Sequence, residues 1–221
     1  MTSYDAVVFD NDGVLVELTP MDALRAAVRD AFDDVGVTDP DDRLVELAAD
    51  HEDLEALAAV ESEHGVSLDE FWAARERRAT EHQQSLIREG GKPAYDDLHR
   101  VTDLDAALGV VSNNQQATVE TVVDHYGLHD AVGTVYGREP TVAGARRRKP
   151  DTYYLDRALD DLGTDDALYV GDSEKDVVTA QRAGVDSAFL RRPHRSDLEL
   201  SVAPTCEFES LDALVDALGE R

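Results

Sequence analysis

The sequence is poor in cysteine, in lysine and in long apolar runs, and each shortage excludes something. Cys206 is the only cysteine among 221 residues, which excludes an internal disulfide and a cysteine metal cluster. No uncharged apolar run is long enough to span a bilayer, and no signal peptide precedes the first predicted strand. We therefore expect a soluble, cytoplasmic protein.

Basic residues are scarce as a class. Asp and Glu number 48 against 21 Lys and Arg, a formal net charge of -27, and the only lysines are Lys92, Lys149 and Lys175. Such acidity disfavours nucleic acid and anionic membranes as partners. Disorder is excluded because 42% of the residues are hydrophobic and they fall in periodic segments. We infer a folded protein from a halophilic source.

The stretch AVVFDNDGVL, from Ala6 to Leu15, organises the rest of the chain. Four apolar residues predict a short buried strand, and Asp10 and Asp12, two residues apart, share one face of it. Gly13 permits a sharp turn directly afterwards. Adjacent carboxylates repel unless a cation lies between them, and Mg²⁺ favours one or two carboxylates plus a substrate phosphate. An ordinary Asp-rich turn is the alternative.

Hydrophobic spacing divides the chain into two parts. Helices are predicted at 21–35, 41–61 and 67–89, the last opening with a capping box of Ser67 and Glu70. In that helix, Trp72 is expected to be a packing residue. Strands at 108–111, 132–136, 167–170 and 187–190 then alternate with helices near 119–126, 151–162, 174–183 and 210–218. The pattern predicts an α/β fold with a mostly parallel, Rossmann-like sheet flanked by helices.

Further polar residues fall at strand ends or helix starts, where ligands bind in such sheets. Ser112 and Asn113 could hold phosphate oxygens or begin a helix as N-cap residues. Lys149, before Pro150, could neutralise a phosphate or be a solvated surface lysine. Asp172 and Asp176, four residues apart, could bind a metal or stabilise a helix N-terminus.

Taken together, these segments resemble the four motifs of the haloacid dehalogenase-like hydrolase superfamily. The matching segments are 9–15 (FDNDGVL), 111–113 (VSN), 149–151 (KPD) and 171–176 (GDSEKD). The helical block resembles the cap of the phosphoglycolate phosphatase-like subgroup. The resemblance implies a core domain of residues 1–16 and 93–221 with an inserted helical cap domain of residues 17–92.

The resemblance also implies a mechanism. Asp10 would be the nucleophile that forms an aspartyl-phosphate, and Asp12 the general acid and base. Ser112, Asn113 and Lys149 would hold the phosphoryl group. The metal ligands of Mg²⁺ would be Asp10, Asp172 and the backbone carbonyl of Asp12, supported by Asp176.

Three functions fit these residues. The first is a Mg²⁺-dependent phosphatase acting on a small phosphorylated metabolite, without nucleic acid or membrane partners. The dehalogenases of the superfamily lack an acid at the position of Asp12, so phosphoryl transfer is favoured over dehalogenation. A phosphomutase of the β-phosphoglucomutase type would use the same core, and a protein that binds a phosphate ligand without turnover would keep the same fold.

We expect the protein to lose stability when salt is diluted. The Debye length grows from about 3 Å at 1 M salt to about 10 Å at 0.1 M, so the surface carboxylates then repel one another over longer distances. The midpoint of thermal unfolding, followed by circular dichroism, should therefore be lower in about 0.1 M than in about 1 M KCl. An equal or higher midpoint at low salt would contradict the halophilic interpretation.

Overall fold

A computed structural model describes residues 4–50 and 53–219. The chain forms two compact units. The first comprises Met1–Leu18, Pro93–Arg138 and Arg147–Arg221, and the second comprises Thr19–Lys92 and Glu139–Arg146. The second unit thus includes a short segment that lies outside the predicted helical block of residues 17–92. No helix of the described residues is long and apolar enough to cross a membrane.

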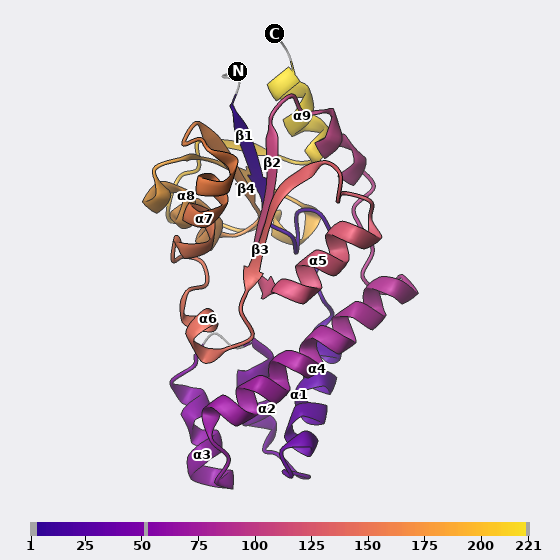
Figure 1. Cartoon of the computed structure of the whole chain (residues 1–221), viewed down its shortest axis with the longest axis vertical. Helices are drawn as coiled ribbons and strands as arrows, with labels where there is room; N and C mark the ends of the chain where they lie inside the picture. The colour runs from indigo at the N-terminus through magenta and orange to yellow at the C-terminus, as the bar shows by residue number, and fades with distance from the viewer. Residues whose placement is uncertain (1–3, 51–52, 220–221) are drawn as a thin grey trace. The chain divides into compact units, whose positions relative to one another are not determined.

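A six-stranded sheet forms the centre of the first unit. Its strands are β1 (Ala6–Phe9), β2 (Ala107–Gln115), β3 (Val132–Arg138), β4 (Ala167–Gly171), β5 (Asp186–Leu190) and β6 (Cys206–Phe208). They lie in the order β3-β2-β1-β4-β5-β6, and every neighbouring pair is parallel. The predicted Rossmann-like α/β core is therefore confirmed, and β1 lies at its middle (Figure 1).

Helices cover both faces of this sheet. Helices α7 (Tyr153–Leu162) and α8 (Glu174–Ala183) lie on one face, and α5 (Gln116–His125) and α9 (Leu211–Gly219) lie on the other (Figure 1). Two 3₁₀ turns, η2 (Leu98–Asp103) and η3 (Pro193–Arg195), belong to the same unit. With parallel strands buried on both faces, the apolar runs of β1 and β4 are fully buried, as such sheets require.

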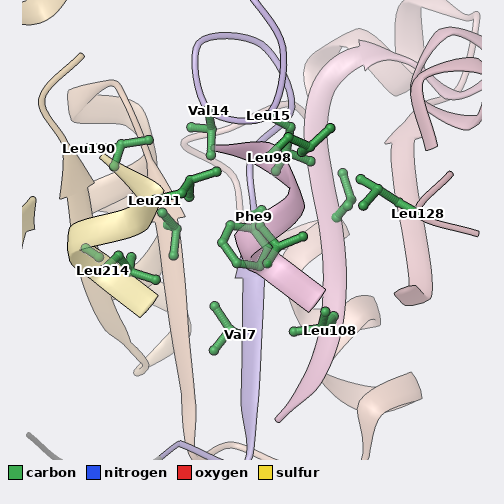
Figure 2. Close-up of a cluster of buried hydrophobic side chains, with 14 of the residues drawn as sticks. Val7, Phe9, Val14, Leu15, Leu98, Leu108, Leu128, Leu190, Leu211 and Leu214 are labelled. Carbon is green, nitrogen blue, oxygen red and sulfur yellow. The ribbon is translucent and has the colours of Figure 1, made fainter. Parts of the chain in front are cut away.

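The alternation of side chains along β1 divides the core into two layers. Val7 and Phe9 belong to the cluster under α5 and α9, whereas Ala6 and Val8 belong to the cluster under α7. Figure 2 shows Phe9 at the centre of the first cluster, with leucines of α9 on one side and Leu108 of β2 on the other. Burying a side chain such as Phe9 contributes about 1.5–3 kcal/mol, so β1 is held in place from both faces.

All regular elements among the described residues of the second unit are helices. It contains α1 (Met21–Asp34), α2 (Asp42–Asp50), η1 (Ala56–Ala58), α3 (Ala59–His64), α4 (Leu68–Glu89) and α6 (Val142–Arg146). Its core includes Phe32 and Phe71, whose ring centroids lie 4.4 Å apart, and the fully buried Trp72. The predicted packing role of Trp72 agrees with this burial. Ser67 caps helix α4 as expected, because its hydroxyl accepts from the Glu70 N–H.

The predicted continuous helix at 41–61 is wrong. Helix α2 ends at Asp50, and a new helical turn begins after Asp53, whose carboxylate accepts from the Ala56 N–H at 2.8 Å. Residues 51 and 52 lie outside the described residues. An aspartate that satisfies a free N–H at a helix start favours a new helix over continuation of the old one.

Arginine–carboxylate pairs are frequent on the surface of both units. Arg78 donates twice to Asp34 at 2.6 Å in the helical unit. In the sheet unit, Arg100 contacts three aspartates of η2 and α9, Asp103, Asp212 and Asp216. Exposed pairs contribute only about 0–1 kcal/mol each and are weakened by salt, so these pairs do not replace the buried core as the source of stability.

Candidate active site

The predicted aspartates follow the two central strands of the sheet. Asp10 comes directly after β1, and its N–H donates to the carbonyl of Val170 on β4 at 2.8 Å. The residue is 8% exposed. Asp12 is half-buried, and its Oδ2 accepts from Asn114 Nδ2 at 2.8 Å. The two carboxylates therefore have different partners and different access to solvent, a difference on which distinct chemical roles can rest.

Lys149 connects the first aspartate to the last. Its Nζ lies 3.0 Å from Asp10 Oδ1, 2.6 Å from Asp176 Oδ1 and 2.7 Å from the hydroxyl of Tyr169. Only 3% of the residue is exposed. The structure thus rules out the solvated surface lysine that the sequence left open. A buried ammonium with two carboxylates is a strong, charge-assisted arrangement.

Asn113 holds the chain at Lys149 through its side chain. Its Oδ1 accepts from the Lys149 N–H at 2.7 Å, and its Nδ2 donates to the Lys149 carbonyl at 3.2 Å. The Lys149–Pro150 peptide bond that follows is cis. The side chain of Asn113 therefore positions the lysine, and only its backbone N–H is left as a group that could face a phosphate.

Ser112 lies within a strand rather than after one. The strand was predicted to end at Val111, but β2 continues to Gln115, which pairs with Arg138 of β3 after a shift in register. Ser112 does not cap α5, whose first residue is Gln116. Its hydroxyl is buried and accepts from the Asn114 N–H at 3.2 Å. Pairing to a neighbouring strand has extended β2 beyond its apolar residues.

Asp176 caps α8, which is one of the two roles that the sequence allowed for it, and it also contacts Lys149. Its Oδ2 accepts from the N–H and hydroxyl of Ser173 at the start of α8, at 3.0 and 2.6 Å. Its other oxygen accepts from Lys149. Gly171 makes this possible, because a Cβ at that position would collide with the Asp176 side chain. The hydrogen bonds that cap α8 therefore also hold the Asp176 carboxylate next to Lys149.

Three of these carboxylates lie close enough together that they could hold a cation. Asp10, Asp172 and Asp176 are buried, and each offers an oxygen within 4.8 Å of the others. The side chain of Asp12 is not part of this group, and the resemblance assigns only its backbone carbonyl to the metal. An all-oxygen donor set with two or more carboxylates fits Mg²⁺ and does not fit metals that prefer nitrogen and sulfur.

Burial dominates the electrostatics of the site. Burial raises the pKa of Asp10 from 3.8 to about 7. The ammonium of Lys149 opposes this shift, and the carboxylates of Asp176, Asp172 and Asp12 add to it. For Lys149, burial lowers the pKa, but the carboxylates of Asp10 and Asp176 outweigh it and the net shift is upward. The lysine therefore stays charged, while the proton affinity of Asp10 depends on the positive charge around it.

Several residues around the site were not found from the sequence. Tyr169 contacts Lys149 and donates to the Val111 carbonyl at 2.9 Å, yet in the sequence it lies inside an apolar strand. His194 and Arg195, which contact Asp172, follow β5 in a stretch without a motif. Only Tyr169 offered a signal in the sequence, because a hydroxyl within a buried strand needs a hydrogen-bond partner.

A sequence model of the haloacid dehalogenase-like hydrolase family matches residues 7–190. The chain belongs to this family. The match spans the segments at 9–15, 111–113, 149–151 and 171–176 on which the resemblance was based, and these segments meet at the carboxyl edge of the sheet.

Relatives within the haloacid dehalogenase-like family include enzymes named phosphoglycolate phosphatase. The one from Rhodospirillum rubrum is 35% identical over 114 residues, which cover 51% of this chain and 46% of that protein. The one from Yersinia pestis is 25% identical over 96% of this chain and 92% of that protein. Thus the match to the Rhodospirillum protein spans less than half of its length.

Solved structures share the fold of this haloacid dehalogenase-like chain. CbbY from Rhodobacter sphaeroides, solved with phosphate, has a TM-score of 0.69 at 19% identity and covers 96% of both chains. A protein from Lactobacillus plantarum described as a phosphoglycolate phosphatase has a TM-score of 0.63 at 21% identity, and the match covers 97% of this chain and 99% of that one. At these identities the likeness concerns the fold alone.

We expect Asp10→Asn to become more stable than the wild type as the pH rises in the absence of metal. The pKa of Asp10 is raised to about 7 in the folded protein and is about 3.9 in an unfolded chain. At a pH between these two values, Asp10 is therefore protonated in the folded state and ionised in the unfolded state. Ionisation of Asp10 therefore removes stability as the pH rises through this window, and asparagine does not ionise.

Denaturant unfolding in EDTA measures this difference. It should be small near pH 4 and should reach about 1 kcal/mol or more above pH 7, since one pKa unit corresponds to about 1.4 kcal/mol. Lys149 keeps Asp176 as a partner in the variant. A difference that is constant across this range, or that is largest in acid, would contradict the raised pKa.

Proposed function

We propose that this protein is a Mg²⁺-dependent phosphatase that hydrolyses a small phosphomonoester through an aspartyl-phosphate intermediate. The observation that carries the proposal is the contact of the buried Asp10 with Lys149, beside a second carboxylate, Asp12, that has its own partner. The similarity to phosphoglycolate phosphatases supports the same reaction class.

Asp10 is the nucleophile in this proposal. Its carboxylate oxygen forms a bond to phosphorus, and the bond between phosphorus and the ester oxygen breaks. Lys149 favours the attacking form because its ammonium stabilises the ionised carboxylate. Its charge also stabilises the phosphoryl oxygens as negative charge develops on them, with the hydroxyl of Ser112 and the backbone N–H of Asn113 as further donors.

Asp12 transfers the protons. It donates one to the leaving ester oxygen in the first step. It then accepts one from the water that attacks phosphorus, which breaks the bond to Asp10 and releases inorganic phosphate. The half-buried position of Asp12 suits this role, because water must reach it in the second step. The amide of Asn114, at 2.8 Å, fixes its orientation.

The metal belongs to the carboxylate group described above. Asp10, Asp172 and the backbone carbonyl of Asp12 would hold Mg²⁺ with support from Asp176, and the ion would offset the negative charge between nucleophile and phosphate. We also propose that the helical unit acts as the cap that the resemblance implies and selects the substrate.

We expect Mg²⁺-dependent release of phosphate from small phosphomonoesters, and its loss in Asp10→Asn. The assay uses p-nitrophenyl phosphate, 2-phosphoglycolate, sugar phosphates and pyrophosphate in molar KCl. Pyrophosphate is included because a pyrophosphatase is among the relatives. Arg100→Ala is the control, since it removes the contacts with Asp103, Asp212 and Asp216 in the same unit and leaves every residue of the proposed site unchanged. Folded wild-type protein that releases no phosphate would reject the proposal, and an isomerised sugar phosphate as product would point to a phosphomutase.

We expect Asp12→Asn to separate the two chemical steps. Removal of a general acid and base lowers turnover by roughly 10²–10⁴-fold. The p-nitrophenolate group leaves without a proton, so the variant should release p-nitrophenol in a burst equal to the enzyme concentration and then stall with Asp10 phosphorylated. Stopped-flow absorbance follows the burst, and mass spectrometry detects the added phosphoryl group. Turnover like that of the wild type would assign proton transfer to another residue.

A further inference from the structure

A basic segment after β5 reaches the site from outside the four motifs. Residues 191–198 contain Arg191, Arg192, His194 and Arg195. Arg195 Nε donates to Asp172 Oδ2 at 3.0 Å, and His194 Nε2 lies 2.8 Å from the same oxygen. Asp172 is 3% exposed. Both contacts are therefore made to one oxygen of a buried carboxylate that the proposed function assigns to the metal.

The histidine is oriented by a tyrosine. The hydroxyl of Tyr95 lies 3.4 Å from His194 Nδ1. If this hydroxyl donates to Nδ1, the ring proton of neutral His194 is on Nε2, where it faces Asp172. In that tautomer Nε2 carries the proton that faces Asp172 Oδ2, 2.8 Å away.

Two arginines anchor the basic segment. Arg191 Nη1 donates to the carbonyls of Arg195 and Leu198 at 3.1 and 2.9 Å. Arg192, which is buried, makes two hydrogen bonds to Asp97 at 2.7 and 2.8 Å and one to the carbonyl of Val14 at 3.0 Å. The segment is thus fixed to the loop after β1 that carries the first two aspartates. Donors held in this way present a fixed geometry to Asp172.

Gly13 provides the space for this contact. A Cβ at Gly13 would collide with Asp172 Oδ2 and lie 3.1 Å from His194 Nε2, and the backbone there has a φ of +81°. Three loops, which follow β1, β4 and β5, therefore meet at a single carboxylate oxygen. The close approach of the Gly13 backbone to Asp172 and His194 is therefore set by the backbone and does not depend on flexible surface side chains.

We propose that Arg195 and His194 are positioning residues for the metal ligand Asp172. They hold Oδ2 and so direct Oδ1 toward the cation, a role that rests on the proposed function because it requires a metal at Asp172. Hydrogen bonds to a ligating carboxylate fix its orientation, and their loss typically weakens metal binding by 10–100-fold. A competing effect has the opposite sign, since a positive charge next to the ligand repels the metal. Orientation is the stronger effect in this proposal.

Direct titration with Mn²⁺ tests the inference without relying on activity. The full chain, stripped with EDTA and returned to molar KCl, is titrated with Mn²⁺ alone, and free Mn²⁺ is measured by electron paramagnetic resonance. The dissociation constant should rise about tenfold or more in Arg195→Ala, and Arg195→Lys, which keeps a donor and a charge, should recover part of the loss. Arg100→Ala again serves as the control and should bind as the wild type does.

The outcomes separate the inference from the proposed function. Absence of Mn²⁺ binding by the folded wild type rejects the metal site itself. If the wild type binds Mn²⁺ and Arg195→Ala binds it equally well or more tightly, the positioning role is overturned. Arg195 then acts only as a positive charge that repels the metal. Circular dichroism reports whether each variant folds. If Arg195→Ala does not fold, the same comparison is made with His194→Phe, which removes the donor but keeps a ring of similar size.

Discussion

Four carboxylates, Asp10, Asp12, Asp172 and Asp176, come together at the carboxyl edge of the sheet, and their mutual repulsion is the constraint on which the surrounding structure depends. Two like charges at such distances are stable only with positive charge or protons between them. Lys149 lies between Asp10 and Asp176, and a basic segment that follows the neighbouring strand β5 contacts Asp172. The glycines at 13 and 171 provide the space for these approaches. One carboxylate oxygen from each of Asp10, Asp172 and Asp176 lies within 4.8 Å of the others, which is close enough for all three residues to contact one cation.

The parts of the site that follow from local sequence were predictable. A run of buried residues ending in Asp10, and another ending at Gly171 and Asp172, place chemistry at strand ends because parallel strands share one carboxyl edge. The start of α8 was also evident, since Asp172 and Asp176 are carboxylates of the kind that stabilise a helix N-terminus. Even the ambiguity at Asp176 was instructive. The local pattern allowed a cap or a ligand, and the structure shows one carboxylate that caps with one oxygen and contacts Lys149 with the other.

The parts that depend on long-range contacts were not predictable from one sequence. Arg195 is separated from Asp172 by 23 positions, and nothing in the local pattern indicates that a turn after β5 folds back toward β4. Tyr169 was hidden for a related reason, because a tyrosine in an apolar strand has the same pattern as a core residue. The end of β2 was misplaced since pairing with β3, which is a tertiary interaction, extends it through Ser112 to Gln115. The helix break at Asp53 was missed although its signal is local, a carboxylate that accepts from the Ala56 N–H three residues later.

The distribution of the three lysines has a practical consequence. Lys92 and Lys149 are buried, and Lys175 is the one lysine of the described residues that is partly accessible. Reagents that acylate lysine side chains therefore have few targets, because the guanidinium groups of arginine do not react under the same conditions. Among the described residues, such a reagent would modify a single side chain, on α8, one position before Asp176. A fluorophore attached there would lie on the helix that carries the last carboxylate of the site.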